Sequence, residues 1–269
     1  MKTISIVNHK GGVGKTTTTF NFGGELVKKG YKVLLIDFDS QGNLSATALG
    51  RTNEESFNEI QTIADALDGL LEDREPDIPI YSTGVDGMDI IPCNLSFANT
   101  IIKLNYAVAR EGYLRQLVNL IKDSCDYDYI LIDNAPTIEI SFQNSLAACD
   151  EVLIISEPDI YSMEGIKTLI SQINKIRKYF NPDIDISGIL INKMDKTNYS
   201  KDMVGIIGDI WHKDIRVFNT RIPKSVKTQE SQTIGLPVSS YAPDNPVGKA
   251  FKEFTEEFLG KEERYADKV

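Results

Sequence analysis

Two lysines, three glycines and a run of threonines stand together near the start of the chain, in the stretch Val7–Thr19 (VNHKGGVGKTTTT). The glycines let the backbone curl so that successive N–H groups face one anion. Lys15 can reach the β- and γ-phosphates of a nucleotide, and Thr16 can offer its hydroxyl to Mg²⁺. With a helix that starts at about Lys15, these residues predict a phosphate-binding loop.

The loop departs from the usual pattern G-x-x-x-x-G-K-[ST], because His9 stands where that pattern has its first glycine. Lys10 follows directly and adds a second cation to the loop. Such a lysine is either an exposed surface charge or a cation that stabilises the transition state of phosphoryl transfer. The spacing alone leaves both interpretations open.

Acidic residues end two apolar, strand-like runs. Asp37 and Asp39 close the run LLIDFD, and Asp133 closes the run YILID. Ligands bind at the carboxyl edge of parallel sheets, and residues i and i+2 of a strand point the same way. One carboxylate of the first pair can hold a metal-bound water while the other orients the attacking water. Asp133 follows three apolar residues, which is the Walker B pattern of a Mg²⁺-binding carboxylate.

The string Asn192–Asp195 (NKMD) ends a third strand-like run. N-K-x-D is also the motif with which GTPases read guanine, its aspartate pairing with the base. Taken alone, this string predicts GTP as the nucleotide.

The chemistry needs a scaffold, and alternating strand and helix patterns predict one. Several strands are apolar at consecutive positions, which is typical of strands buried on both faces. Helical patterns between them, such as the apolar stripe of residues 166–180, indicate right-handed βαβ units. We therefore predict an α/β fold, a single-domain P-loop NTPase with a mostly parallel twisted sheet and helices on both faces. The predicted strands are Thr3–Asn8, Lys32–Asp39, Met88–Cys93, Tyr129–Ala135, Glu151–Ser156 and Ile186–Asn192.

The other helical patterns complete the expected domain. Gly30 ends the helix that follows the phosphate loop, and the terminal helix breaks at Gly260. We assign residues 1–260 to one domain and residues 261–269 to a charged tail that frays. The expected helices are Lys15–Lys29, Ile60–Leu71 and either one or two helices within Ser96–Lys122, where Gly112 is the candidate interruption.

Composition limits the classes of protein that the chain can belong to. The net charge of −10 over 269 residues argues against a constitutively basic nucleic-acid binder but allows a local basic patch. The three cysteines are far apart, which disfavours a zinc site or an iron–sulfur cluster ligated within one chain. The chain begins directly with a strand-like run and has no long apolar run, so we expect a soluble cytoplasmic protein.

The short form K-G-G-x-G-K-[ST]-[ST], which includes Lys10, resembles the deviant Walker A loop of the family that contains ParA, MinD and the nitrogenase iron protein. The string D-x-D-x-Q-G-N from Asp37 and the segment IPKSVK from Ile222 resemble the ParA group. The resemblance runs from residue 3 to about residue 259 and is weakest over residues 51–87. It departs after Asp133, where D-N-A-P replaces the usual D-x-P-P, and in the segment IPKSVK, which has lysine where the family has arginine.

The resemblance implies a role for each part of the site. The string DKTNYS that begins at Asp195 matches the ParA continuation, which favours ATP over GTP and places Asn192 at the base. Asp39 would position the attacking water, and Lys10 would cross a dimer interface to the phosphates of the facing subunit. The implied catalytic residues are Lys10, Lys15 and Asp39, and the Mg²⁺ residues are Thr16, Asp37 and Asp133. The implied nucleotide contacts are Lys10, Gly11, Gly12, Val13, Gly14, Lys15, Thr16, Thr17, Asn192 and Pro223. The implied DNA contacts are Lys196, Lys201, Lys224 and Lys227.

The function that the resemblance implies is that of a ParA-type partition ATPase. ATP would close a homodimer that binds DNA non-specifically on the nucleoid, and a ParB-like centromere-binding adaptor would stimulate an otherwise slow hydrolysis and release it. The alternative is a MinD-like, membrane-cycling positioning ATPase, which needs a C-terminal amphipathic helix. The stripe of Phe251, Phe254 and Phe258 is better explained as core packing, because its helix is rich in acidic residues. A nucleotide-gated scaffold without catalysis would have the same sequence pattern.

Overall fold

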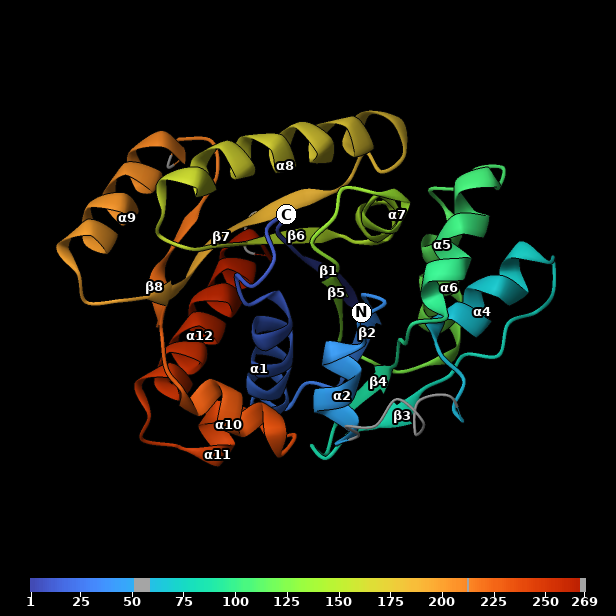
Figure 1. Ribbon diagram of the computed structural model, residues 1–269, viewed down its shortest axis with the longest axis horizontal. Coiled ribbons are helices and arrows are strands. Elements are labelled where there is room, and N and C mark those ends of the chain that lie inside the picture. The colour runs from blue at the N-terminus through green and yellow to red at the C-terminus, as the bar shows by residue number, and fades with distance from the viewer. Residues whose placement is uncertain (51–58, 212, 267–269) are drawn as a thin grey trace.

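The structure, a computed structural model, describes residues 1–50, 59–211 and 213–266 (Figure 1). Within these residues eight strands form one sheet in the order β3-β4-β2-β5-β1-β6-β7-β8, parallel throughout except for the β3–β4 pair. The predicted fold class is confirmed. The strands are β1 Lys2–Val7, β2 Val33–Phe38, β3 Tyr81–Ser82, β4 Met88–Ile91, β5 Tyr129–Asn134, β6 Glu151–Ser156, β7 Asp185–Met194 and β8 Val217–Pro223.

Helices cover both faces of the sheet (Figure 1). Side chains of α1 and α12 pack on one face, and those of α4 to α9 pack on the other. Every residue of β2, β5 and β6 is buried, which explains why these strands are apolar at consecutive positions. The helices are α1 Lys15–Lys28, α2 Asn43–Leu49, α4 Ile63–Leu71, α5 Phe97–Tyr106, α6 Tyr113–Ser124, α7 Ile140–Ala148, α8 Ile160–Tyr179, α9 Asn198–Trp211, α10 Lys227–Thr233, α11 Val238–Tyr241 and α12 Pro246–Ala266.

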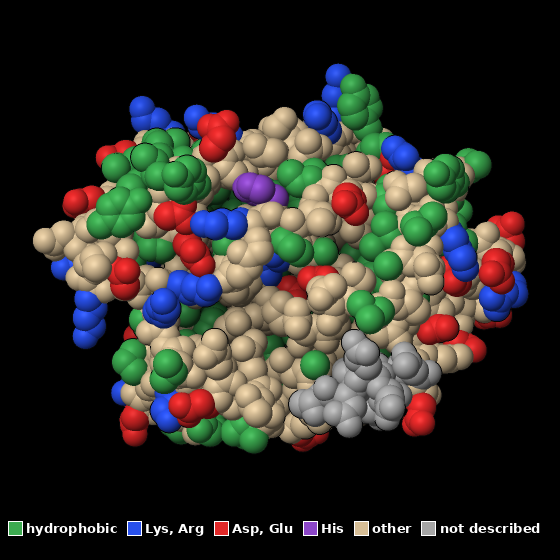
Figure 2. Space-filling view, viewed as in Figure 1, with side chains coloured by type: hydrophobic (Ala, Val, Ile, Leu, Met, Phe, Trp, Pro, Cys, Tyr) green, Lys and Arg blue, Asp and Glu red, His purple; other side chains and the backbone are tan. Residues whose placement is uncertain are grey.

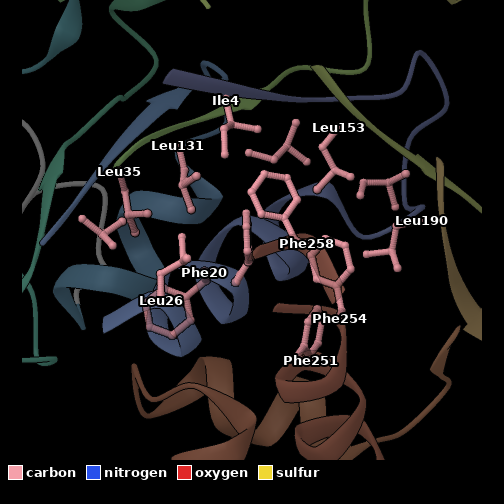
Figure 3. Packing of buried hydrophobic residues seen from close by; sticks show 14 of the residues in the cluster. Ile4, Phe20, Leu26, Leu35, Leu131, Leu153, Leu190, Phe251, Phe254 and Phe258 are labelled. Carbon is pink, nitrogen blue, oxygen red and sulfur yellow. The ribbon is translucent and has the colours of Figure 1, made fainter. Parts of the chain in front are cut away.

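The aromatic stripe of α12 lies in the core, as predicted. Phe251, Phe254 and Phe258 are fully buried and point at the sheet beside α1 (Figure 3). The rings of Phe22 and Phe254 lie 5.1 Å apart between centroids, a separation at which aromatic pairs add to the stability gained from burial. These apolar side chains therefore already have partners inside the protein. Among the described residues, no helix is long and apolar enough to cross a bilayer.

Several local predictions need correction. The predicted helix break at Gly260 is wrong, because α12 continues to Ala266, while residues 267–269 lie outside the described part of the chain. The region Ser96–Lys122 holds two helices, and Gly112 directly precedes the second. The sequence patterns did not predict α7, α9, α10 or α11. They also did not predict α2, β3 and β8, which are short or carry a mixed apolar and polar pattern. The helix expected from Ile60 starts at Ile63, because the side chains of Thr62 and Asp65 form a capping box there.

The strand order brings the functional loops together. β1 lies between β5 and β6, so the loop after β1 and the carboxyl ends of β2 and β5 meet at one edge of the sheet. In the β2–β5 pair, Asp37 lies opposite Asp133. This edge is where open α/β sheets bind ligands.

Candidate nucleotide site

A cleft of about 960 Å³ opens above the loop between β1 and α1. Gly12 and Gly14 in this loop have φ angles of 77° and 94°, which L-residues with a side chain rarely adopt. α1 starts directly after them at Lys15, so its free N–H groups face the cleft. The cleft is lined by residues of this loop, of the β2, β5, β7 and β8 ends, of α2, and of α10, including Gly11, Gly12, Gly14, Lys15, Thr16, Thr17, Asp39, Asn134, Asn192, Lys193, Pro223, Lys224, Thr228 and Gln232.

Lys15 lies at the bottom of the cleft and is 6% exposed. Its Nζ donates to the carbonyl oxygen of Lys10 at 3.3 Å. Burial lowers the pKa of this ammonium group, against the opposing effect of the carboxylates of Asp133 and Asp39. A buried cation held by a single carbonyl binds an incoming anion strongly, because little water has to be displaced from it.

Asp133 supplies the oxygen that a metal ion would need. It is 1% exposed, and its Oδ1 accepts from Thr19 Oγ1 at 3.4 Å. Its Oδ2 is buried without a hydrogen-bond partner in the described part of the chain. Burial raises the pKa of this carboxyl to about 7, although a hydrogen bond from Thr16 works in the other direction. An unpaired carboxylate oxygen beside the Thr16 hydroxyl is a donor set that fits Mg²⁺.

The donor set is small, which is also informative. Among the described residues no group of three or more His, Cys, Asp and Glu side chains could hold a metal ion. Mg²⁺ usually keeps several waters and binds through one or two carboxylates together with substrate phosphates. The residues present therefore fit a Mg²⁺ ion that arrives with a nucleotide.

The two acids after β2 occupy different environments. Asp37 is fully buried, and its Oδ2 accepts from Ser45 N at 2.8 Å and from Ser45 Oγ at 2.6 Å. Burial, together with the negative charge of Asp133, raises the pKa of Asp37 to about 8. Asp39 lies beyond the end of the strand and lines the cleft. Of the two carboxylates that we expected to face the ligand, only Asp39 lines the cleft, and a metal role for Asp37 stays a prediction.

Lys10 points away from the cleft that its own loop forms. Its Nζ donates to Asp159 Oδ2 at 2.8 Å and lies 4.0 Å from Glu157 Oε2. The hydrogen bond to Asp159 raises the pKa of Lys10 above its usual value. The Lys10 side chain is 44% exposed, and Lys10 is absent from the cleft lining. Within one chain, Lys10 is therefore held by the start of α8.

The end of β7 braces the phosphate loop. Asn192 Nδ2 donates to the carbonyl oxygen of Val13 at 2.8 Å, so part of the amide that we expected at the base is already engaged. Lys193, which we did not predict, donates to the carbonyl oxygen of Gly12 and pairs with Glu157 at 3.1 Å. It adopts a φ angle of 53°, which is uncommon for a residue with a side chain. A base contact by Asn192 and a nucleotide contact by Pro223, which lines the cleft, stay predictions.

The aspartate of the NKMD string, which resembles the guanine-reading motif, has a local structural role. Asp195 Oδ1 accepts from Thr197 N at 3.0 Å and from the Thr197 hydroxyl, just before α9. Asp195 does not line the cleft. The carboxylate that would pair with guanine is thus engaged in an Asx-type turn at the start of a helix.

The four lysines that we predicted to bind DNA lie in different surroundings, and a DNA contact by them stays a prediction. Lys227 Nζ pairs with Glu230 Oε2 at 2.6 Å, which neutralises part of its charge. Lys224 lines the cleft, and Lys196 and Lys201 are exposed near the start of α9. The sequence reading also missed α10 as a wall of the cleft. Gln232 Nε2 donates to Thr17 Oγ1 at 3.1 Å. These residues are 215 positions apart in the sequence, so no local pattern predicts the contact.

The surface beside the cleft mixes charge with apolar side chains. Figure 2 shows basic and acidic side chains next to one another there, and apolar side chains gathered over the start of α8 and over α9. The exposed apolar residues at the start of α8 and along α9 are Ile160, Tyr161, Tyr199, Ile206 and Ile210.

Comparisons with known proteins agree with this geometry. A family model described as an AAA domain, AAA_31, matches residues 1–186. The sporulation initiation inhibitor protein Soj of Bacillus subtilis (strain 168) is 32% identical over 257 residues, which cover 95% of this chain and 97% of Soj. The structure is similar to that of cobyrinic acid a,c-diamide synthase from Mycobacterium smegmatis with bound ADP and magnesium, with a TM-score of 0.79 and 26% identity over 96% of this chain and 94% of that one. It is also similar to septum site-determining protein MinD from Pyrococcus horikoshii OT3 complexed with Mg-ADP, with a TM-score of 0.73 and 25% identity over 95% of each chain.

Proposed function

The chain belongs to the AAA_31 family and is a ParA/MinD-type partition ATPase, and on this premise we propose that ATP makes it a dimer that holds DNA until hydrolysis releases it. ATP and Mg²⁺ are its cofactors. One observation carries the proposal: one lysine of the phosphate loop lies inside the cleft, and the other lies outside it. Lys15 is buried at the bottom of the cleft, and Lys10 lies outside it.

Binding and positioning fall to residues that line the cleft and to Asp133, which is buried and absent from the lining. Lys15 and the loop N–H groups would hold the phosphates, and Thr16 and Asp133 would hold Mg²⁺, which would neutralise phosphate charge. Asp39, at the cleft wall and partly exposed, orients the attacking water and accepts its proton. Asn192 and Pro223 flank the adenine. This arrangement favours positioning and electrostatics over covalent chemistry, as phosphoryl transfer requires.

Dimerisation completes the site. A lysine outside its own cleft can reach the phosphates of a facing subunit, where it supplies a cation in trans. The exposed apolar side chains over α8 and α9 lie on the surface beside this cleft (Figure 2), which supports an interface there. ATP then acts as a switch, because the second subunit closes only over an occupied site.

DNA binding follows from pairing two weakly basic surfaces. A single chain of net charge −10 repels DNA, whereas a dimer brings two sets of Lys196, Lys201, Lys224 and Lys227 to one duplex. Contacts of this kind are independent of sequence and sensitive to salt. A ParB-like adaptor that stimulates hydrolysis would release the dimer from the nucleoid. We assign this function to one domain that includes residues 1–260.

The MinD-like alternative has less support. It needs an apolar helix face that is free to enter a membrane, yet Phe251, Phe254 and Phe258 of α12 are fully buried in the core. A vesicle co-sedimentation assay run beside a DNA-binding assay, each with ATP and with ADP, separates the two functions. Retention on anionic vesicles with ATP and no retention on DNA would favour the alternative.

The main test combines oligomeric state with DNA binding. Light scattering after gel filtration should give a dimer mass with ATP and a monomer mass with ADP. The Lys196→Glu/Lys227→Glu variant should keep the ATP dimer and lose DNA binding, with a weaker dependence of affinity on salt. Lys175→Glu/Lys178→Glu, which changes exposed lysines of α8, is the matched control for net charge. Equal loss of DNA binding in both variants would contradict the assigned patch, and a monomer with ATP would contradict the dimer.

A further inference from the structure

The ring of His9 lies directly against the backbone of α8. A Cβ atom added at Gly165 would lie 2.2 Å from His9 Cε1 and 3.1 Å from each ring nitrogen, and the first of these distances is far shorter than real Cβ contacts. A glycine inside a helix is unfavourable compared with alanine. The close approach of the His9 ring therefore explains why α8 has no side chain at this position.

Hydrogen bonds of the ring nitrogens do not account for the position of the His9 ring. His9 Nδ1 is buried and has no hydrogen-bond partner among the described residues. A buried polar atom without a partner is unfavourable, so a hydrogen bond does not hold the ring there. The shape of the ring, packed on the helix backbone, is what the contact uses.

The residues on either side of His9 are attached to the same unit. Asn8 Nδ2 donates to the carbonyl oxygen of Ile155 in β6 at 2.5 Å. Lys10 Nζ donates to Asp159 Oδ2 at 2.8 Å. Three successive residues of the phosphate loop are therefore held by β6, by the helix α8 and by the residue that precedes it.

Asp159 connects the loop to the first turn of α8. This residue is the N-cap of the helix, and its Oδ1 accepts from Ser162 N at 3.0 Å while its Oδ2 accepts from Lys10. A movement of Lys10 would thus act on the same carboxylate that starts α8. The next two residues, Ile160 and Tyr161, are 55% and 80% exposed, so the start of α8 is also open to a partner.

From these contacts we propose that His9 is a positioning residue that couples α8 to the phosphate loop. Its ring acts as a wedge, so that residues 8–10 and the start of α8 move together. In the single chain this keeps Lys10 beside Asp159 and outside the cleft. When nucleotide shifts the loop, the start of α8 shifts with it. The proposal rests on the proposed function in one respect, namely that Lys10 acts on the phosphates of a facing subunit.

A double-mutant cycle tests the wedge. Gly165→Ala places a methyl group where the ring lies, and it should weaken ADP affinity of the single chain at least fivefold because the loop is displaced. In the His9→Ala background the same change has room, and it should alter ADP affinity less than twofold. Gly205→Ala in α9 is the matched control, because a Cβ there meets nothing within 4 Å, and it should leave ADP affinity within twofold of the wild type.

A second readout separates positioning from stability. Hydrogen exchange over residues 160–166 should change when ADP is added to the wild type and to His9→Phe, which keeps a flat ring, but not in His9→Ala. Thermal unfolding of each variant shows whether it folds. If Gly165→Ala does not fold, the exchange comparison of His9→Phe with His9→Ala decides alone.

Two results would overturn the proposal. One is an equal effect of Gly165→Ala in the wild-type and His9→Ala backgrounds, and the other is an exchange response of α8 to ADP that persists in His9→Ala. ADP binding to the single chain needs neither a dimer nor DNA. A failed dimer or DNA assay with an intact cycle would contradict the proposed function alone, and an additive cycle with an intact dimer would contradict the wedge alone.

Discussion

The two sides of the phosphate loop differ in how they are held. On the α1 side, Lys15 starts a helix that packs on the central core with Phe20, Phe22 and Leu26, all fully buried. On the α8 side, Lys10 is held by partly exposed acids, Asp159 at 2.8 Å and Glu157 at 4.0 Å. The first attachment is built into the core, whereas the second is an exposed ion pair that water and salt weaken.

This difference separates two tasks within one short loop. A cation that binds phosphate in every state needs a fixed position, and a buried helix start provides one. A cation that changes partners must be bound weakly enough to be released. The exposed ion pairs of Lys10 meet this requirement, because such pairs contribute only about 0–1 kcal/mol to stability. The Lys15 side chain is therefore fixed where it binds phosphate, whereas the Lys10 side chain is held only weakly by its acids.

The largest effect is expected from removing Lys10, the lysine that we propose changes partners. Lys10→Ala should lower partner-stimulated ATP turnover by about 10³-fold, the scale at which a cation in trans acts on phosphoryl transfer. Its ADP affinity should change less than about threefold, because Lys10 lies outside the cleft in the single chain. Turnover and equilibrium ADP binding are measured on the same preparation. A loss of ADP affinity as large as the loss of turnover would show that Lys10 acts in its own cleft.

Removal of Lys15, in contrast, should lower ADP affinity itself. Lys15→Ala deletes a charge-assisted contact to phosphate worth about 1.5–3 kcal/mol, so ADP affinity should fall by about 10- to 150-fold. Calorimetric titration of ADP measures this. The Lys15→Arg variant keeps the charge but changes the shape of the cation, so ADP affinity should stay below that of the wild type. Full affinity in this variant would mean that the site needs only a positive charge and not the compact ammonium group of lysine.

The pH dependence should come from the acids on the α1 side. Burial raises the pKa of Asp133 to about 7, and this carboxyl must be ionised to hold Mg²⁺. The Mg²⁺-dependent part of nucleotide affinity should therefore fall about tenfold from pH 8 to pH 6, with protons released on Mg²⁺ binding. Titrations in two buffers of different ionisation enthalpy measure the release.

The same raised pKa has the opposite effect on the protein without Mg²⁺. The folded state holds the Asp133 proton more tightly than the unfolded state, so this contribution to stability is full below about pH 4 and is lost as pH rises through 7. Asp133→Asn should remove both effects. A nucleotide affinity that does not change between pH 8 and pH 6 with Mg²⁺ present would contradict the assignment of Asp133.

The smallest expected effect comes from loosening the hold on Lys10. Asp159→Asn removes the negative charge that pairs with Lys10, on a side chain that is 23% exposed. Lys10 should then be released more easily, and ATP-dependent dimerisation should become at most about fivefold tighter. Because asparagine is also a good N-cap, α8 should keep its start. The measured quantity is the dimer dissociation constant with ATP. Weaker dimerisation would indicate that Asp159 contributes to the interface itself.

Several parts of the fold and site follow from local patterns. Consecutive apolar residues predict β2, β5 and β6, and the spacing of Phe251, Phe254 and Phe258 predicts a buried helix face. β8 could not be predicted in this way, since only Phe218 and Ile222 of its residues are buried. Its place at the edge of the sheet relaxes the pattern, because one side of an edge strand has no neighbour.

The spacing of Asp37 and Asp39 shows where a local rule ends. The i, i+2 rule holds within a strand, but β2 ends at Phe38, and Asp39 turns with the loop. Ser45, eight residues later on α2, then satisfies the buried carboxylate of Asp37. The difference between the two acids thus depends on α2, a helix that the sequence patterns did not predict.

The phosphate-binding chemistry of the loop follows from the local sequence, because Gly12, Gly14, Lys15 and Thr16 are close together in the chain. The local sequence does not show which lysine faces the cleft, which acid keeps an unpaired oxygen, or which helix His9 contacts, because each depends on how the chain folds. These outcomes depend on residues from distant segments, such as Lys10 and Asp159, which are 149 positions apart. Contacts of that range arise when a sheet brings strand ends together, and no local periodicity encodes them.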